Sequence, residues 1–142
     1  MKKQLAITLP VRDLARSQAF FTALGFTFNP QFSSEQGSGM NLSDDIYVML
    51  VKEAFFGTLT KKPMADPRSS TIALLCLFCD SREEVDAMAA RAQSLGATLP
   101  EDPEDHGFMY QHGFEDLDGH MWELAFMESM PEQQPESADA AI

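Results

Sequence analysis

The feature that most constrains this fold is a succession of elements that occurs twice along the chain. Residues 5–11 alternate in the manner of a strand, and Asp13 then offers an N-cap to a helix that stops at Leu24-Gly25. An apolar strand at residues 71–79 is followed by Asp80 or Ser81 as a helix cap and by a stop at Leu95-Gly96. This weak internal similarity predicts two copies of one structural module.

Short extended segments follow each predicted helix. They lie at residues 26–28, 40–42 and 46–51 in the first half, before a short helix at 54–59, and at residues 97–99, 108–115 and 120–127 in the second half. Each half therefore has the order β-α-β-β-β, which predicts an α+β fold. We expect a single domain over residues 1–128, with modules at about 4–60 and 71–127 and a linker at 61–70. Residues 129–142 are acidic and aperiodic, so we expect a disordered tail.

Length and charge narrow the classes of partner. A chain of 142 residues suits one domain, and 22 acidic against 10 basic residues give a net charge of -12. This charge repels nucleic-acid phosphates and anionic membrane surfaces, so we expect a small-molecule or protein partner and neither nucleic acid nor membrane. The chain has neither a signal-peptide core after Lys3 nor an apolar run of about 20 residues, so we expect a cytoplasmic protein.

The two cysteines, Cys76 and Cys79, form a C-x-x-C pattern that invites a redox or zinc interpretation. On a strand, however, residues three apart point to opposite faces and lie about 10 Å apart, too far for a disulfide. A zinc site would also need a second pair of ligands. We therefore interpret both cysteines as small core residues.

Three segments resemble the vicinal oxygen chelate superfamily, which includes glyoxalase I, bleomycin-resistance proteins and extradiol dioxygenases. They are Leu9-Pro-Val-Arg-Asp-Leu14, Phe20-Phe21 with the following Leu24-Gly25-Phe26, and Asp116-Leu-Asp-Gly-His-Met-Trp-Glu-Leu124. The resemblance covers roughly residues 4–127. It implies two β-α-β-β-β modules whose curled sheets enclose a ligand cleft, with the helices outside, and it implies a homodimer because this family often assembles its modules across subunits.

The resemblance also implies positions for metal ligands on the first and fourth strands of each module. In this chain those positions fall on Ala6, Met49, Thr71 and Glu123, of which only Glu123 is a usual ligand. A divalent ion of this class needs at least three protein donors, so the family ligand set is incomplete. The expectation is a glyoxalase/bleomycin-resistance-like protein that binds its ligand without a catalytic metal. The alternative is a metal-dependent lyase, isomerase or dioxygenase with altered ligands, so the cofactor stays undefined between no metal and a divalent ion.

Strand alternation predicts the lining of the cleft. Bulky apolar residues at 122, 124 and 126 can pack on a helix, which turns Glu123 and Met121 toward the cleft. We expect Tyr47, Met49 and Thr71 on the same lining, and Tyr110 as a further ligand-stacking residue. This surface is mostly apolar with a few hydroxyl groups, which suits a flat apolar or aromatic molecule.

A catalytic pair is predicted from the turn between the last two strands. If residues 116–119 close a four-residue hairpin, His112 lies opposite Glu123, with Cβ atoms about 5 Å apart. This pair could transfer protons or provide two metal ligands. The alternative is a buried hydrogen-bonded pair that fixes the hairpin. His120 is interpreted as a surface residue beside the turn.

Overall fold

The computed structural model describes residues 2–128, so the expected tail at 129–142 lies outside the described residues. The first module contains four strands and one main helix, followed by a short extra helix. These are β1 (Leu5–Val11), α1 (Leu14–Ala23), β2 (Thr27–Ser33), β3 (Gly37–Asn41), β4 (Ile46–Lys52) and α2 (Glu53–Leu59). The second module repeats the order with β5 (Leu74–Phe78), α3 (Arg82–Ser94), β6 (Glu104–Asp105), β7 (Met109–Glu115) and β8 (Met121–Met127).

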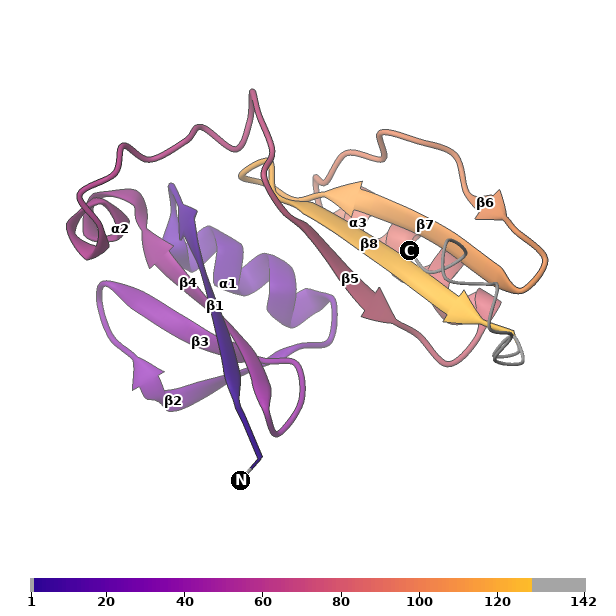
Figure 1. The fold of residues 1–142 in the computed structure, drawn as a ribbon, viewed down its shortest axis with the longest axis horizontal. Coiled ribbons are helices and arrows are strands. Elements are labelled where there is room, and N and C mark those ends of the chain that lie inside the picture. Colours follow the sequence, from indigo (N-terminus) through magenta and orange to yellow (C-terminus); the bar gives the residue numbers. More distant parts are fainter. Residues whose placement is uncertain (1, 129–142) are drawn as a thin grey trace, which may run out of the picture.

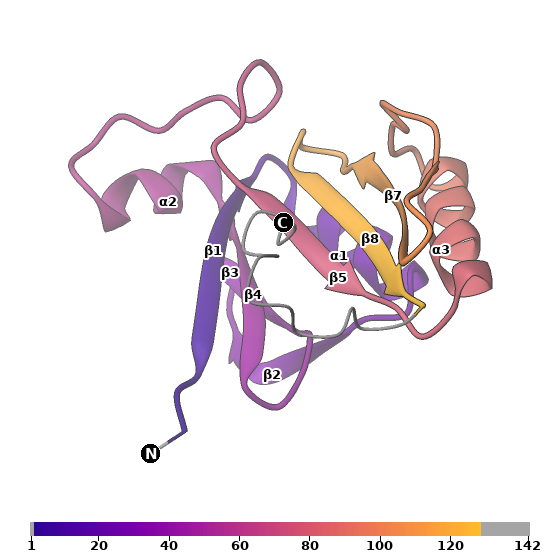
Figure 2. The ribbon, with the colours of Figure 1, turned by 45° about the vertical axis from the view of Figure 1, so that its right-hand side comes forward.

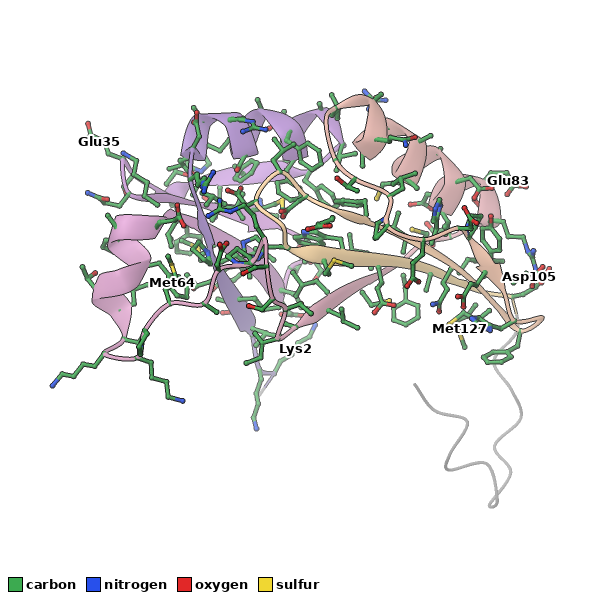
Figure 3. The ribbon with its side chains drawn as sticks, turned by 90° about the horizontal axis from the view of Figure 1, so that it is seen from above. Lys2, Glu35, Met64, Glu83, Asp105 and Met127 are labelled. Carbon is green, nitrogen blue, oxygen red and sulfur yellow. The ribbon has the colours of Figure 1, made fainter. Side chains whose placement is uncertain are left out.

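Each module forms one four-stranded mixed sheet. The strand orders are β1-β4-β3-β2 and β5-β8-β7-β6, and in each sheet the first strand pairs in parallel with the last one in sequence. Helices α1 and α3 lie on the same side of the two sheets (Figure 1, Figure 3). The expected α+β fold of two β-α-β-β-β modules is therefore confirmed.

Local signals fix the ends of both main helices. The Asp13 side chain accepts a hydrogen bond from the Arg16 amide at 3.1 Å, and the Ser81 hydroxyl accepts one from the Glu84 amide at 3.0 Å. Each helix ends before a glycine with positive φ, 109° at Gly25 and 108° at Gly96. The repeated Leu-Gly pattern thus marks two equivalent helix ends.

The two modules share one apolar core. From α1, the ring centroid of Phe20 lies 6.0 Å from that of Phe114 on β7, and the centroid of Phe21 lies 5.3 Å from that of Trp122 on β8. All four side chains are buried. Contact between the modules therefore runs through the helix-covered side of the sheets, and Figure 2 shows α1 between the two sheets and behind them.

Several predicted strand boundaries are wrong. Residues 97–99 contribute only an isolated bridge between Thr98 and Glu115, and β5 begins at Leu74 rather than at residue 71. Strand β2 continues past Asn29-Pro30 because the β2–β3 pairing shifts register between Asn29 and Ser33, which accommodates a proline without a ladder hydrogen bond. The short strand β6 was not expected.

None of the helices in the described residues is long and apolar enough to cross a membrane.

Candidate ligand-binding site

The first sheet has an open face on the side away from α1. Val48 and Leu50 of β4 point into the core and are fully buried, so Tyr47 and Met49 point the other way. Strand β1 pairs Ala6 with Tyr47 and Thr8 with Met49, which places these four side chains together on the open face. This register places Tyr47 and Met49 on the same face, and their contact with a ligand stays a prediction.

An aromatic stack lies on this open face. The rings of Phe32 and Tyr47 have centroids 5.5 Å apart and planes inclined by only 11°, and Phe32 is 47% exposed. Gly39 permits this close packing, because a Cβ atom there would lie 2.9 Å from the Phe32 Cβ and 3.1 Å from the Met49 Sδ. Phe32 was not predicted as a site residue, because the predicted strand covered only residues 26–28. Strand alternation gives no signal for it, since Phe28 pairs with the buried Met40 on the core face and the register shift between Asn29 and Ser33 changes the face of the residues that follow.

The second sheet also has an open face, which carries Glu123. Glu123 lies on β8 and pairs with Cys76 on β5 and with Gly113 on β7. Met121 lies two residues earlier on β8 and points to the same face. A cavity of about 170 Å³ opens here; we call it the Glu123 cavity, and its lining includes Leu74, Met121 and the loop carboxylates Glu101, Asp102 and Glu104. The cavity combines an apolar floor with four carboxylates, including Glu123, and its lining among the described residues has no Lys or Arg.

The predicted pairing of His112 with Glu123 is wrong by one residue. Strand β7 pairs Gly113 with Glu123 and His112 with Leu124, so the turn comprises residues 116–120 rather than 116–119. Both residues border the Glu123 cavity, but alternation sends their side chains to opposite faces of the sheet. The His112 Nε2 donates to the Glu101 carbonyl at 3.2 Å, whereas its Nδ1 is buried and finds no hydrogen-bond partner among residues 2–128.

Tyr110 also lies on the helix-covered face of the second sheet, away from the Glu123 cavity. Its hydroxyl donates to Asp86 of α3 at 2.6 Å, and the Arg82 guanidinium lies 5.0 Å from the ring centroid. Arg82 itself bonds to Asp105 and Glu128 at 2.7 and 2.8 Å. The structure therefore places Tyr110 in a contact between α3 and β7, rather than with the other predicted ligand-binding residues.

Thr71 lies between the modules. It borders a second cavity of about 280 Å³, here called the junction cavity, together with Thr8 and Met121. His120 borders this cavity too, and its Nε2 donates to the Pro10 carbonyl at 2.7 Å. The prediction of His120 as a surface residue is wrong, because the turn folds back onto the first module.

This turn contains two buried aspartates, of which Asp118 connects the modules and Asp116 holds the turn itself. Asp118 accepts hydrogen bonds from the Arg12 amide at 2.9 Å and from the Ser17 hydroxyl at 3.0 Å. Asp116 accepts from the Trp122 indole at 3.0 Å and from the amides of residues 118 and 120 at 2.9 Å each. Burial raises the pKa of Asp116, while the charge of His120 and these hydrogen bonds oppose the shift.

The cysteine environment disfavours thiolate chemistry. Burial and the neighbouring Glu123 charge raise the pKa of Cys76, and burial, followed by Glu84 and Asp80, raises the pKa of Cys79 to about 11. Both thiols are free. The interpretation as core residues fits Cys79, which is half-buried, whereas Cys76 is exposed on the open face.

The positions at which the resemblance expects metal ligands do not fit a divalent ion. Ala6 offers no donor and Met49 offers a thioether, which prefers softer metals. Across residues 2–128, no three His, Cys, Asp or Glu side chains form a group that could hold a metal ion. Of the four expected ligand positions, Glu123 alone carries a usual ligand for a divalent ion, and it supplies one carboxylate.

Comparisons with solved structures show what this fold resembles. Hypothetical protein SA1046 from S. aureus superposes with a TM-score of 0.76 at 24% identity, over 89% of this chain and 94% of that one. The fosfomycin resistance protein FosX from Listeria monocytogenes superposes with a TM-score of 0.64 at 23% identity, over 94% of this chain and 96% of that one. TnmS3, an antibiotic binding protein from Streptomyces sp. CB03234, superposes with a TM-score of 0.62 at 23% identity, over 89% of this chain and 97% of that one. At these identities the likeness shows the fold alone.

Sequence comparison identifies the family. Among curated proteins no sequence matches the chain. The family model of the Glyoxalase/Bleomycin resistance protein/Dioxygenase superfamily, in contrast, matches residues 3–124, which span both modules, the Phe20-Phe21 segment and the turn at residues 116–120. The chain therefore belongs to the glyoxalase/bleomycin resistance protein/dioxygenase superfamily.

Proposed function

We propose that this protein binds a small, flat apolar or aromatic molecule on the open faces of its sheets. The observation that carries the proposal is the stack of the exposed Phe32 ring on the half-buried Tyr47 ring, beside Met49 on the side of the sheet away from α1. Aromatic and thioether side chains in such a position provide stacking and dispersion contacts for a planar ligand. The names of two similar structures, an antibiotic binding protein and fosfomycin resistance proteins, support a small-molecule ligand.

Glu123 provides the polar contact in this proposal. It lies on an open face that includes Met121 and Leu74, where a carboxylate can accept a hydrogen bond from a ligand hydroxyl or amino group. The three loop carboxylates of the same cavity disfavour an anionic ligand. Binding is therefore expected to favour neutral or cationic molecules over acids of the same shape.

Proton transfer between His112 and Glu123 is not part of the proposal, because their side chains lie on opposite faces of the sheet. Metal-independent binding follows from the donor set, since Ala6, Met49 and Thr71 do not supply the ligands that accompany Glu123 in the family pattern. A metal-dependent lyase, isomerase or dioxygenase is the competing function, and the experiment below includes it.

We further propose that two copies of the chain associate. The edges of β1 and β5 are unpaired within the described residues, and β5 exposes 59% of Leu74 and 68% of Phe78. Large apolar side chains on a free strand edge are typical of a contact with another chain. A homodimer would cover them, and sedimentation of the wild type and of Leu74→Lys would test it. A monomeric wild type would contradict this. A cytoplasmic location stays a prediction from the sequence.

The binding proposal is tested with 1-pyrenemethanol, a neutral planar molecule of four fused rings whose fluorescence reports binding. We expect Tyr47→Ala to weaken binding at least fivefold, because the stacking surface is lost. The matched control is Tyr110→Ala, which removes a tyrosine from the opposite side of the second sheet and should leave the affinity within twofold. Equal affinities of wild type and Tyr47→Ala would overturn the proposal. Loss of binding or turnover on chelation, restored by a stoichiometric divalent ion, would establish the metal-dependent alternative instead.

A further inference from the structure

The junction cavity lies where four segments of both modules meet. These segments are the end of β1, the helix α2, the linker before β5 and the turn between β7 and β8. In Figure 1 the linker crosses from α2 to the start of β5, next to the β7–β8 turn, and Figure 3 shows Met64 beside α2. The cavity measures about 280 Å³, and its wall is mostly apolar, with Phe56, Met64 and Met121 among the contributors.

The linker wall of this cavity is fixed by packing. Gly119 has a positive φ of 99°, and a Cβ atom on it would lie only 2.6 Å from the Pro67 carbonyl oxygen. The backbone of the linker thus rests directly on the turn. The Asp66 side chain accepts from the Arg68 amide at 3.0 Å, and the Asp66 carbonyl accepts from the amides of Ser69 and Ser70, which closes a local turn.

His120 gives the cavity one polar group of defined character. Its Nε2 must carry a proton, because its partner, the Pro10 carbonyl, can only accept. In the neutral imidazole the other nitrogen, Nδ1, is then an acceptor. Within residues 2–128, no protein group donates a hydrogen bond to this nitrogen. When the imidazole is neutral, His120 can therefore offer Nδ1 as a hydrogen-bond acceptor, on a side chain that borders the cavity.

We propose that the junction cavity is a second small-molecule site, which borders the open face that carries Tyr47 at Thr8 but lies mainly between the two modules. Its ligand class is a neutral aromatic molecule of one or two rings that bears one hydroxyl or ring N–H, such as a phenol or an indole. The apolar wall receives the ring, and His120 Nδ1 accepts the hydrogen bond. The volume lies near the lower end of the range of about 300–1,000 Å³ that ligand sites occupy, which limits the ligand to this size.

Charge and position support this ligand class. The buried Asp116 and Asp118 lie in the same turn as His120, so an anionic ligand such as a benzoate would be repelled. Met121 borders both the junction cavity and the Glu123 cavity, so the two cavities meet at this side chain. The second site is nevertheless lined by the linker and α2, which contribute nothing to the Glu123 cavity among the described residues.

The test compares 4-methylphenol with 4-methylanisole, which has nearly the same ring but no donor. Binding is followed by amide chemical shifts of the full chain, so that the site is located and the affinity measured together. We expect shifts at Thr71, Ala73 and Gly119, and an affinity for 4-methylphenol roughly fivefold higher than for 4-methylanisole, which corresponds to one neutral hydrogen bond.

Two variants and one control make the result decisive. Ala65→Phe fills the cavity from an exposed linker position, so it should abolish binding without affecting folding. His120→Ala should leave 4-methylanisole binding in place and remove the preference for the phenol. Tyr110→Ala, on the helix-covered face of the second sheet and outside the lining of the junction cavity, should change neither affinity. Shifts confined to Gly39 and Tyr47, or unchanged binding by Ala65→Phe, would overturn the second site while leaving the open-face proposal standing.

Discussion

Asp118 offers a direct measure of how strongly the two modules are joined. Its carboxylate belongs to the second module, is only 6% exposed, and accepts hydrogen bonds from the Arg12 amide and the Ser17 hydroxyl of the first. Asp118→Ala leaves both donors without their acceptor. Hydrogen bonds to a charged group are worth about 1.5–3 kcal/mol each, and part of this offsets the cost of burying the carboxylate, so we expect a net loss of about 3 kcal/mol.

The assay is urea unfolding followed by the fluorescence of Trp122, the single tryptophan of the chain, which is buried beside Phe21. Ser17→Ala and the double variant complete a mutant cycle, and we expect a coupling energy of about 1–2 kcal/mol between Asp118 and Ser17. Asp44→Ala, at an exposed position in the β3–β4 turn, is the control and should stay within about 0.5 kcal/mol of the wild type. A loss below about 1 kcal/mol for Asp118→Ala, or strictly additive effects, would refute the role of this carboxylate.

Three further outcomes are expected. Gly119→Ala should lower the free energy of unfolding by more than about 2 kcal/mol, because the positive φ and the contact with Pro67 act together. Gly57→Ala, in a helix with open space around it, is the control and should be neutral or stabilising. Equal effects of the two substitutions would contradict the geometry. Phe114→Ala should cost about 3–5 kcal/mol in the same unfolding assay, since it empties the core between Phe20 and Trp122, and a loss under 1 kcal/mol would show that the modules do not share this core. A pKa of about 11 leaves the Cys79 thiol mostly protonated at pH 9. In a Cys76→Ser variant, which leaves Cys79 as the single thiol, the reaction with iodoacetamide should be roughly fifty to a hundred times slower in the native state than in urea. Similar rates in the two states would exclude the raised pKa.

The sequence predicted the parts of the fold that short-range chemistry determines. Asp13 and Ser81 cap their helices as expected, and the Leu-Gly stops at residues 25 and 96 end them, because each signal acts within one turn of helix. The placement of Tyr47, Met49 and Glu123 on open faces followed from strand alternation. These features need only neighbours in the sequence.

Other parts depended on contacts that a sequence does not display. The hairpin register was wrong by one residue because the Asp116 carboxylate accepts from the amides of both residues 118 and 120, which draws His120 into the turn. His120 is held there by the Pro10 carbonyl, 110 residues earlier in the chain. Thr71 was expected in a strand, yet it lies in the linker, whose course depends on its packing against Gly119. For His120 and Thr71 a long-range contact decided between locally equivalent patterns, whereas the hairpin register depended on one side chain within the turn.

The exposed linker between α2 and β5 has a consequence for how this chain is stabilised. Each module builds its own sheet and helix, and the contacts that join the modules are side chains and one turn rather than continuous backbone pairing. In thermodynamic terms the chain behaves as a heterodimer whose subunits have been fused. A short covalent tether holds the two modules at an effective concentration of about millimolar, so even a weak junction stays closed. Cleavage near Lys61 would therefore convert a stability that is independent of protein concentration into one that falls on dilution.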